Sequence, residues 1–161
     1  LRQGPFGADN LNLHIGEFVR RSLAVSGSGA RFHGSIIMVS SNDRALNLYN
    51  GDTGILLKDD VSGELRAVFE DGDKFRSHSI HNLPPYKSAF AMTVHKSQGS
   101  EFERILMPLP DNPQHRLLSR EILYTGLTRA KKAAFIFASD ECLQAGIERQ
   151  SERHSGLNFW G

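Results

Sequence analysis

The amino-acid sequence predicts an α/β protein with a parallel sheet and a small inserted β-barrel. Residues 34–83 contain several short apolar segments with turn signals at close spacing, a pattern typical of a small barrel. Residues 86–137 alternate apolar strand-like segments with a helical pattern, which favours a parallel sheet covered by helices. The chain has 161 residues, which suits one ordinary domain or one domain with a small insert. Apolar residues make up 39% and charged residues 23%, which favours a folded core over disorder.

The bulk composition excludes some classes of protein. No apolar segment approaches the roughly 20 residues needed to span a bilayer. Cys142 is the only cysteine, so no internal disulfide can form and a cytoplasmic location is expected. The net charge of +1 neither indicates nor excludes nucleic-acid binding, because binding needs only a local basic face. The chain starts at Leu1 without a methionine, so we expect it to be cut from a longer protein.

Residues 1–24 are expected to form a turn and then a helix. The turn signal lies in Gly4–Gly7, and Asp9 or Asn10 is expected to cap the helix. A flexible break is expected at Ser26–Gly29. The apolar residues that recur at helical spacing are Leu11, Ile15, Phe18 and Val19.

The barrel is predicted from alternating strands and turns. Its turn signals are Asn50–Asp52, Ser62–Gly63 and Asp71–Asp73, and Pro84–Pro85 ends the region. Residues 42–47 are a polar connection. The predicted strands are Ile36–Val39, Gly54–Leu57, Leu65–Phe69 and Lys74–Ile80.

The parallel sheet is predicted from three apolar strands and one helix. Ser119 is expected to cap the helix, which contains Leu123, and Lys131 and Lys132 are expected in its last turn, where cations suit the helix dipole. A short helix is predicted at Cys142–Ile147. The predicted strands are Ser88–Thr93, Arg104–Leu109 and Ala133–Ala138.

The polar segment after the first of these strands is one candidate site. Ligands of open α/β sheets bind just beyond strand ends, and Thr93–Gln98 offers several donors suited to phosphates or sugars. Gly99 allows a backbone to come close to another group, and the Glu101 carboxylate can accept from ribose hydroxyls. The alternative is a solvated surface loop, and this segment alone does not decide between the two.

The helical segment Tyr124–Lys131 is a second candidate site. Gly126 inside a helix costs about 1 kcal/mol relative to alanine, so it predicts a close approach of another element. The planar guanidinium of Arg129 can reach outward to a phosphate. The helix by itself favours the alternative, a surface arginine paired with Glu121 or with solvent.

Together, the two segments resemble motifs V and VI of the superfamily 1 helicases. The resemblance is carried by Ala91-Met-Thr-Val-His-Lys-Ser-Gln-Gly-Ser-Glu-Phe102 and Tyr124-Thr-Gly-Leu-Thr-Arg-Ala130, and His-Lys-Ser-Gln-Gly is similar to the 5′-to-3′ branch. Gly4-Pro-Phe-Gly with Leu11-Asn12 resembles the motif IV neighbourhood of the RecD helicases, the alpha subunits of exodeoxyribonuclease V. Asn42-Asp43 with Leu48-Tyr-Asn-Gly-Asp-Thr-Gly-Ile55 resembles the start of that family's inserted barrel.

The resemblance implies a fold and a division of the chain. Residues 1–32 and 84–161 would form a RecA-like second motor lobe of the P-loop NTPase type, with a parallel sheet and motifs IV to VI. Residues 33–83 would form an inserted SH3-like barrel that touches DNA or a neighbouring domain.

The resemblance also implies residue roles. Arg129 would be the arginine finger that reaches the γ-phosphate. Glu101 would contact the ribose, Gly99 would line the nucleotide cleft, and Gln98 would sit between nucleotide and DNA. Arg2 would be the motif IV arginine. The residues implied to face single-stranded DNA or to link the two sites are Thr93, His95 and Lys96.

One absence limits what the chain can do alone. The sequence contains no G-x-x-x-x-G-K-[ST] and no Gly-Lys pair, so the phosphate cradle and its lysine are missing. The resemblance implies that ATP with Mg²⁺ is shared with an N-terminal P-loop lobe of the same protein. The resemblance implies DNA, including single strands and duplex ends, as a partner, together with the beta and gamma subunits of exodeoxyribonuclease V. No nuclease cluster is evident.

Other interpretations stay open. One alternative is that the chain is a lobe of another superfamily 1 helicase, such as a relaxase-helicase or a Dda-like enzyme. A second alternative is a non-catalytic binding module in which the barrel makes the contact with the ligand. His78 and His81 are three positions apart, but no further ligand pair supports a metal site. Phe159-Trp160 would dock on a partner or on the lobe itself, and the sequence does not choose.

Overall fold

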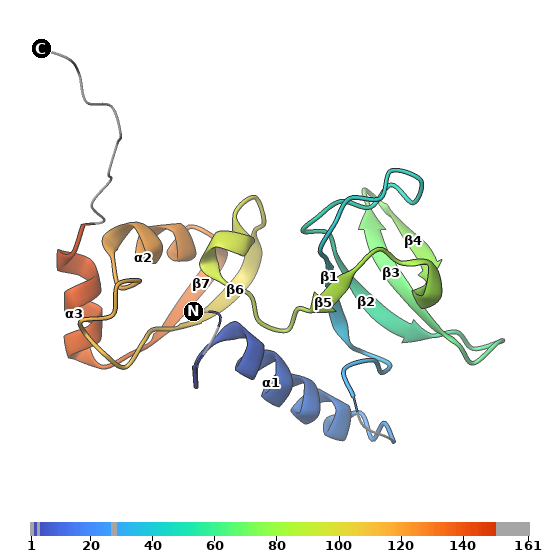
Figure 1. Ribbon diagram of the computed structural model, residues 1–161, viewed down its shortest axis with the longest axis horizontal. Coiled ribbons are helices and arrows are strands. Elements are labelled where there is room, and N and C mark those ends of the chain that lie inside the picture. Colours follow the sequence, from blue (N-terminus) through green and yellow to red (C-terminus); the bar gives the residue numbers. More distant parts are fainter. Residues whose placement is uncertain (1, 3, 27–28, 151–161) are drawn as a thin grey trace, which may run out of the picture. The chain divides into compact units, whose positions relative to one another are not determined.

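The computed structural model describes residues 2, 4–26 and 29–150, and its contacts divide the chain into two compact units (Figure 1). Arg2–Met92 form the amino-terminal unit, and the chain from Thr93 onward forms the carboxy-terminal unit. Part of the predicted break at Ser26–Gly29 and the whole of Phe159-Trp160 lie outside the described residues. In the described part of the chain, no helix has the length and apolar character needed to cross a membrane.

The amino-terminal unit begins with helix α1, Ala8–Ser22. The predicted helix is confirmed, but the predicted cap is wrong. Gly7 is the N-cap, with an extended backbone and no side-chain cap, so Asp9 falls inside the first turn. The Asn10 amide donates to the carbonyl oxygen of Pro5 at 2.8 Å. The helix starts earlier than predicted because Gly7 takes the cap conformation without needing a side-chain acceptor.

The rest of this unit is a five-stranded antiparallel sheet in the order β4-β3-β2-β1-β5. All four strands predicted for the barrel region are present. The described strands leave β4 and β5 as edges, so the pairings do not show a closed barrel. The strands are β1 Ile36–Val39, β2 Thr53–Lys58, β3 Leu65–Asp71, β4 Lys74–Ser79 and β5 Tyr86–Ser88.

The core of the sheet follows from strand alternation, since side chains on one face recur every second residue. Gly72 has φ +61 and lies in the two-residue turn between the paired residues Asp71 and Lys74, as the Asp-Gly signal predicted. A short 3-10 helix, η1, follows β4 at Ile80–Asn82. The buried side chains of the sheet core are Ile37, Val39, Leu48, Leu56, Ala67 and Phe69.

The predicted strand Ser88–Thr93 is wrong. Only Ser88 belongs to a strand, and β5 pairs antiparallel with β1 in the first sheet instead of joining the second. Beyond β5 the chain leaves the sheet, and Val94–Ser97 winds into a short 3-10 helix, η2. The reason is tertiary: the Asn12 side chain bonds both backbone groups of Ala91, which a neighbouring strand would otherwise use.

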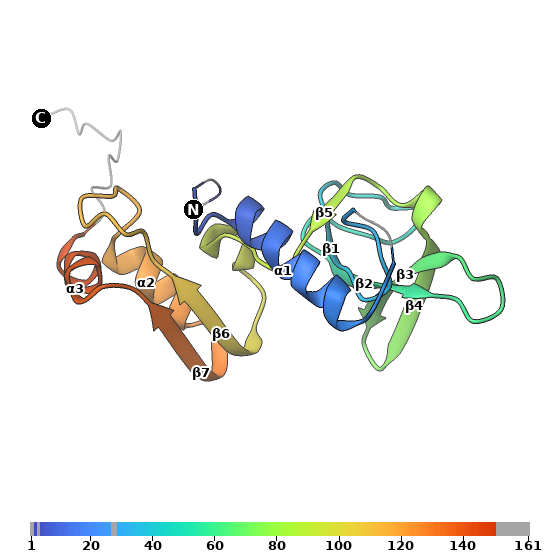
Figure 2. The same ribbon diagram turned by 90° about the horizontal axis from the view of Figure 1, so that it is seen from below.

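The carboxy-terminal unit contains a parallel strand pair, β6 (Phe102–Pro108) and β7 (Ala130–Phe137). Helix α2, Arg120–Leu127, connects the two strands, and α3, Asp140–Glu148, follows β7. Helix α2 packs against β7 and against α3 (Figure 2). Ser119 caps α2 as predicted, because its hydroxyl accepts from the Ile122 amide. The buried core comprises Met107, Leu109, Leu118, Leu123 and Cys142.

Two predictions for this unit are wrong in detail. Helix α2 ends at Leu127 with Thr128 as its cap, so Lys131 and Lys132 lie in β7 and not in the last helical turn. The chain reverses early because Ala130 pairs with Phe102, which brings the lysines into the strand register. The strands are also not buried on both faces in the described chain: Leu106 and Phe135 are 71% and 56% exposed. The fold as observed is mixed α/β.

Candidate functional site

The two segments singled out from the sequence meet at the start of the β6–β7 pair. The Phe102 amide donates to the carbonyl oxygen of Arg129 at 2.8 Å. One guanidinium nitrogen of Arg129 donates to the carbonyl oxygen of Ser100 at 3.4 Å. Since parallel strands begin at the same edge of a sheet, the segment before β6 and the segment before β7 are held side by side. The site is therefore built from both candidate segments.

The prediction that Arg129 lies within a helix is wrong: Arg129 follows Thr128, the C-cap of α2. Its Nε donates to the carbonyl oxygen of Thr125 at 3.2 Å, and its Nη2 donates to the Thr128 hydroxyl at 3.1 Å. The side chain is half-buried, and with Ser100 it contacts three groups. The planar guanidinium of Arg129 is thus held in one orientation by backbone and hydroxyl oxygens, and these oxygens stabilise its positive charge at the start of the β6–β7 pair.

Two exposed ion pairs cross the strand pair beside Arg129. The Glu101 carboxylate lies 3.4 Å from the Lys131 ammonium, and the two side chains are 62% and 55% exposed. Glu103 and Lys132 form the next pair along the strands. Glu101, the predicted ribose contact, therefore pairs with a residue two positions after Arg129 and remains accessible to solvent. A carboxylate and a guanidinium at one edge provide both an acceptor and a donor for a polar ligand.

Helix η2 presents the other predicted residues. His95, Lys96 and Gln98 are exposed, whereas Ser97 is buried and donates its hydroxyl to the carbonyl oxygen of Val94 at 2.8 Å. Thr93 is half-buried and caps the turn in an extended conformation. Ser97 is one of the donors in the predicted ligand segment, but in the structure it is buried and bonds only locally. A 3-10 helix has three residues per turn, so Ser97 lies on the same face as the apolar Val94, and this spacing is the signal for its inward position.

Gly99 is required by the backbone. Its φ is +85, a left-handed conformation that side-chain-bearing residues rarely adopt. A Cβ atom at Gly99 would meet no described atom within 4 Å, so within the described chain no neighbour makes the close approach that had been expected. The glycine sets the turn that leads from η2 to Ser100 and Glu101.

Gly126 makes the close approach that was predicted for it. A Cβ atom there would lie 2.5 Å from the Met107 sulfur of β6 and 3.6 Å from the Val94 Cγ2 of η2. Helix α2 can therefore pack directly on β6 and on the turn that carries His95 and Lys96. This contact joins the two candidate segments through packing as well as through hydrogen bonds.

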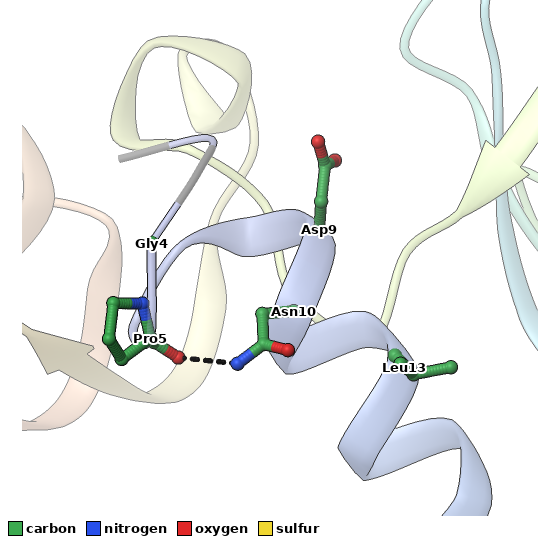
Figure 3. A pocket seen from close by; sticks show the side chains of 5 residues that line it. All are labelled: Gly4, Pro5, Asp9, Asn10 and Leu13. Atoms are coloured by element: carbon green, nitrogen blue, oxygen red, sulfur yellow. Dashed lines mark hydrogen bonds between the residues drawn. The ribbon is translucent and has the colours of Figure 1, made fainter.

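The amino-terminal unit holds the remaining predicted site residue and a surface hollow. Arg2 pairs with Asp9 at 3.2 Å, and both side chains are exposed. The hollow near the start of α1 contains the hydrogen bond from Asn10 to Pro5 (Figure 3), and none of the predicted site residues lines it. Its lining residues are Gly4, Pro5, Asp9, Asn10 and Leu13.

The two histidines considered as metal ligands lie in β4 and in the 3-10 helix η1. The described residues contain no group of three or more His, Cys, Asp or Glu side chains placed to hold an ion. His78 packs edge-on against Phe69, with ring centroids 6.1 Å apart. Burial lowers the pKa of His78 below its ordinary value, and the positive charges of Arg76 and Arg66 lower it further. His78 is a packed side chain of the sheet, and its lowered pKa disfavours the charged form.

Sequence comparisons identify relatives of the chain. Residues 88–137 match the UvrD-like helicase C-terminal domain. The RecBCD enzyme subunit RecD of Mycolicibacterium smegmatis is 35% identical over 97% of this chain and 27% of its own length. RecD of Haemophilus influenzae is 37% identical over 98% of this chain and 23% of its own length. The ATP-dependent RecD2 DNA helicase of Deinococcus radiodurans is 31% identical over 94% of this chain.

The relatives are much longer than this chain, which spans between 21% and 27% of these three proteins. The fold is similar to the crystal structure of Pif1 helicase from Bacteroides in complex with ADP-AlF3 and ssDNA, with a TM-score of 0.50 and 17% identity. That likeness covers 85% of this chain and 40% of the Pif1 chain. The chain is therefore homologous to a part of the RecD proteins, and its residues 88–137 correspond to a UvrD-like helicase C-terminal domain.

Proposed function

We propose that the chain is the second motor lobe of an ATP-dependent DNA helicase that translocates 5′ to 3′. The complete protein would be an alpha subunit of exodeoxyribonuclease V, working in the cytoplasm with beta and gamma subunits on broken DNA ends in double-strand-break repair and recombination. The names of the RecD and RecD2 relatives support this proposal. The DNA-bound Pif1 structure supports only the fold, because its identity to this chain is low.

The observation that carries the proposal is the hydrogen-bonded contact between the Arg129 turn and the Ser100–Phe102 segment. It gathers a fixed guanidinium, an accessible carboxylate and an exposed basic turn around one edge of a strand pair. This donor set fits one side of a nucleoside triphosphate: Arg129 would face the γ-phosphate, and Glu101 would face the ribose, with Gly99 lining the cleft. Bound ATP with Mg²⁺ would supply the free energy of hydrolysis. A P-loop lobe outside this sequence would hold the other phosphates and the metal.

The same contact gives a route for coupling. Three of the five N–H donors of Arg129 are used in the described contacts, so the others can donate to a phosphate oxygen. A shift of the guanidinium toward that oxygen would weaken the long 3.4 Å bond to the Ser100 carbonyl first. This bond ties the Ser100 carbonyl, just beyond η2, to the turn that follows α2, so its release would loosen the segment that carries His95 and Lys96. Thr93, His95 and Lys96 would grip single-stranded DNA, with Gln98 between the two ligands. Alternate tightening and release would move the strand.

The finer architecture belongs to the same proposal. We infer that β6 and β7 are part of a larger RecA-like parallel sheet, and that the five-stranded sheet is an SH3-like barrel in the complete protein. The division into residues 1–32 with 84–161 and an insert at 33–83 stays a prediction. In the described chain β6 and β7 pair only with each other and expose an apolar face at Leu106 and Phe135, which supports a larger sheet that is covered on both faces.

Arg129→Ala in the complete helicase tests the proposal. The variant should lose ATP turnover by about a thousandfold or more, as expected for an arginine finger, while its affinity for single-stranded DNA stays near that of the wild type. Arg129→Lys should also be inactive, since an ammonium cannot replace the planar fork. Arg104→Ala, an exposed arginine of β6, is the matched control and should turn over ATP normally. Normal turnover in Arg129→Ala would exclude the role.

A further inference from the structure

The segment that leads from β5 toward η2 is anchored at three consecutive residues. The Ala89 amide donates to the carbonyl oxygen of Ile36 at 2.9 Å. Phe90 stacks on Phe32 with ring centroids 6.3 Å apart, and a Cβ atom on Gly16 would lie 3.3 Å from the Phe90 ring. The third anchor is at Ala91. The path of the chain just before Thr93 is therefore determined within the amino-terminal unit.

The anchor at Ala91 is a side chain that imitates a neighbouring strand. The Asn12 Nδ2 donates to the carbonyl oxygen of Ala91 at 2.8 Å, and the Ala91 amide donates to the Asn12 Oδ1 at 3.0 Å. Nδ2 also donates to the carbonyl oxygen of Ala8 at 2.8 Å, which holds the amide in this orientation. Both groups of Asn12 and both backbone groups of Ala91 are thus satisfied by one planar contact between residues 79 positions apart.

Asn12 stands in a stripe of α1 that faces this segment. Ala8, Asn12 and Gly16 follow one another at helical spacing of four residues, and Ala8 and Gly16 are buried. Their small side chains allow the helix to approach Phe90 and Ala91 closely. Asparagine is a poor helix former, so its presence in the middle of α1 is explained by the tertiary contact and not by helix propensity.

We propose that Asn12 is a positioning residue for DNA-dependent ATP turnover, and this rests on the function proposed above. Met92 alone separates Ala91 from Thr93, where the segment proposed to grip DNA begins. By holding both backbone groups of Ala91, Asn12 restrains the backbone two residues before that segment begins. It touches neither nucleotide nor DNA, and it acts through Ala91.

The structural half of the proposal is tested by amide hydrogen exchange on the 161-residue chain. Asn12→Ala should speed exchange of the Ala91 amide by about tenfold, in line with the loss of a side-chain acceptor. Asn10→Ala is the matched control, because Asn10 lies on the same helix and bonds only locally to Pro5 in the described contacts. Asn12→Asp keeps the side chain's size but places an oxygen against the carbonyls of Ala8 and Ala91. It carries the test if Asn12→Ala does not fold.

The functional half is tested in the complete helicase. Asn12→Ala and Asn12→Asp should raise the single-stranded DNA concentration that gives half-maximal ATP turnover by about tenfold, with the KM for ATP unchanged. Asn10→Ala should leave both values unchanged. A general loss of stability would instead lower turnover without separating DNA from ATP, and that result, or Asn12 variants that match Asn10→Ala, overturns the proposal. Failure of the proposed function would appear in the wild type, as turnover that DNA does not stimulate.

Discussion

The amide of Phe102 donates a hydrogen bond to the carbonyl oxygen of Arg129 at 2.8 Å. Phe102 opens β6 and Arg129 lies directly before β7, so this bond joins the two parallel strands at their shared starting edge. Ser100 and Glu101 then lie beside Arg129 and Lys131. The relationship explains why two segments that are undecided when considered singly form one polar site, and it underlies most of the predictions that follow.

Glu101→Gln should weaken the binding of ATP without changing the stability of the fold. Its ion pair with Lys131 is exposed and is expected to contribute less than about 1 kcal/mol, so the unfolding temperature should barely change. If Glu101 contacts the ribose, the KM for ATP in the complete helicase should rise about tenfold. Glu103→Gln removes the adjacent pair with Lys132 and is the matched control. An equal change in KM for both variants would argue against a specific role for Glu101.

Lys96→Ala should weaken the binding of single-stranded DNA in a salt-dependent way. Lys96 is exposed on η2, where a phosphate contact would release counterions. The slope of log affinity against log salt should fall in magnitude by about 0.7, the contribution of one phosphate contact to a single strand. Lys132→Ala, which removes an exposed lysine of β7, should keep the wild-type slope. Unchanged slopes in both variants would remove Lys96 from the DNA contact.

Gly126→Ala should destabilise the carboxy-terminal unit, although alanine is the better helix former by about 1 kcal/mol. The new Cβ would fall 2.5 Å from the Met107 sulfur, and such overpacking costs about 1–3 kcal/mol. The sign should reverse in a Met107→Ala background, where the clash is absent and only the helix preference remains. Thermal or urea unfolding of the four proteins measures this. If Gly126→Ala lowers stability equally in both backgrounds, the Met107 contact is not the cause.

Acidification should destabilise the amino-terminal unit through His78. The pKa of His78 in the folded chain is lowered mainly by burial, and the positive charges of Arg76 and Arg66 lower it further. The negative charge of Asp43 raises it, but this effect is smaller. Below about pH 6.5 the unfolded chain therefore binds a proton that the folded chain takes up less readily. Stability is fully present above that pH and falls as the pH decreases through the window down to the folded pKa.

His78→Gln checks this prediction, because glutamine does not titrate. The unfolding temperature of the wild type should fall between about pH 7.5 and pH 5.5, and the fall should be smaller in His78→Gln. His81→Gln, at an exposed position three residues away, is the control and should retain the wild-type pH dependence. A His78→Gln variant that loses stability as steeply as the wild type would assign the effect to other groups.

Local signals were enough to predict much of the fold. The strands at Ile36–Val39 and Leu65–Phe69 have apolar residues at strand spacing with turn signals beside them, and both are present. Ser119 at a helix start satisfies an amide of its own first turn, so its role depends on neighbouring residues only. Gly126 also signalled its close packing, because a glycine inside a helix needs a compensating contact.

Other features could not be predicted because their partners are distant in sequence. The apolar character of Ser88–Thr93 suits a strand, yet Asn12 occupies the backbone groups of Ala91. Lys131 and Lys132 suit a helix end, yet the pairing of Ala130 with Phe102 draws them into β7. In both cases hydrogen bonds to a remote segment outweigh the local preference, which amounts to only a fraction of a kcal/mol for each residue.

The residue types alone establish the chemistry available at the site and the family that it resembles: a glutamate, a basic turn and an arginine at fixed spacing, without a phosphate-binding lysine loop. The folded chain adds that Arg129 is tied to Ser100 and Phe102, that Ser97 faces inward, and that Asn12 holds Ala91. The reason is physical. Residue types and local periodicity are properties of the chain, whereas the satisfaction of each backbone donor and acceptor depends on which remote segment folds against it.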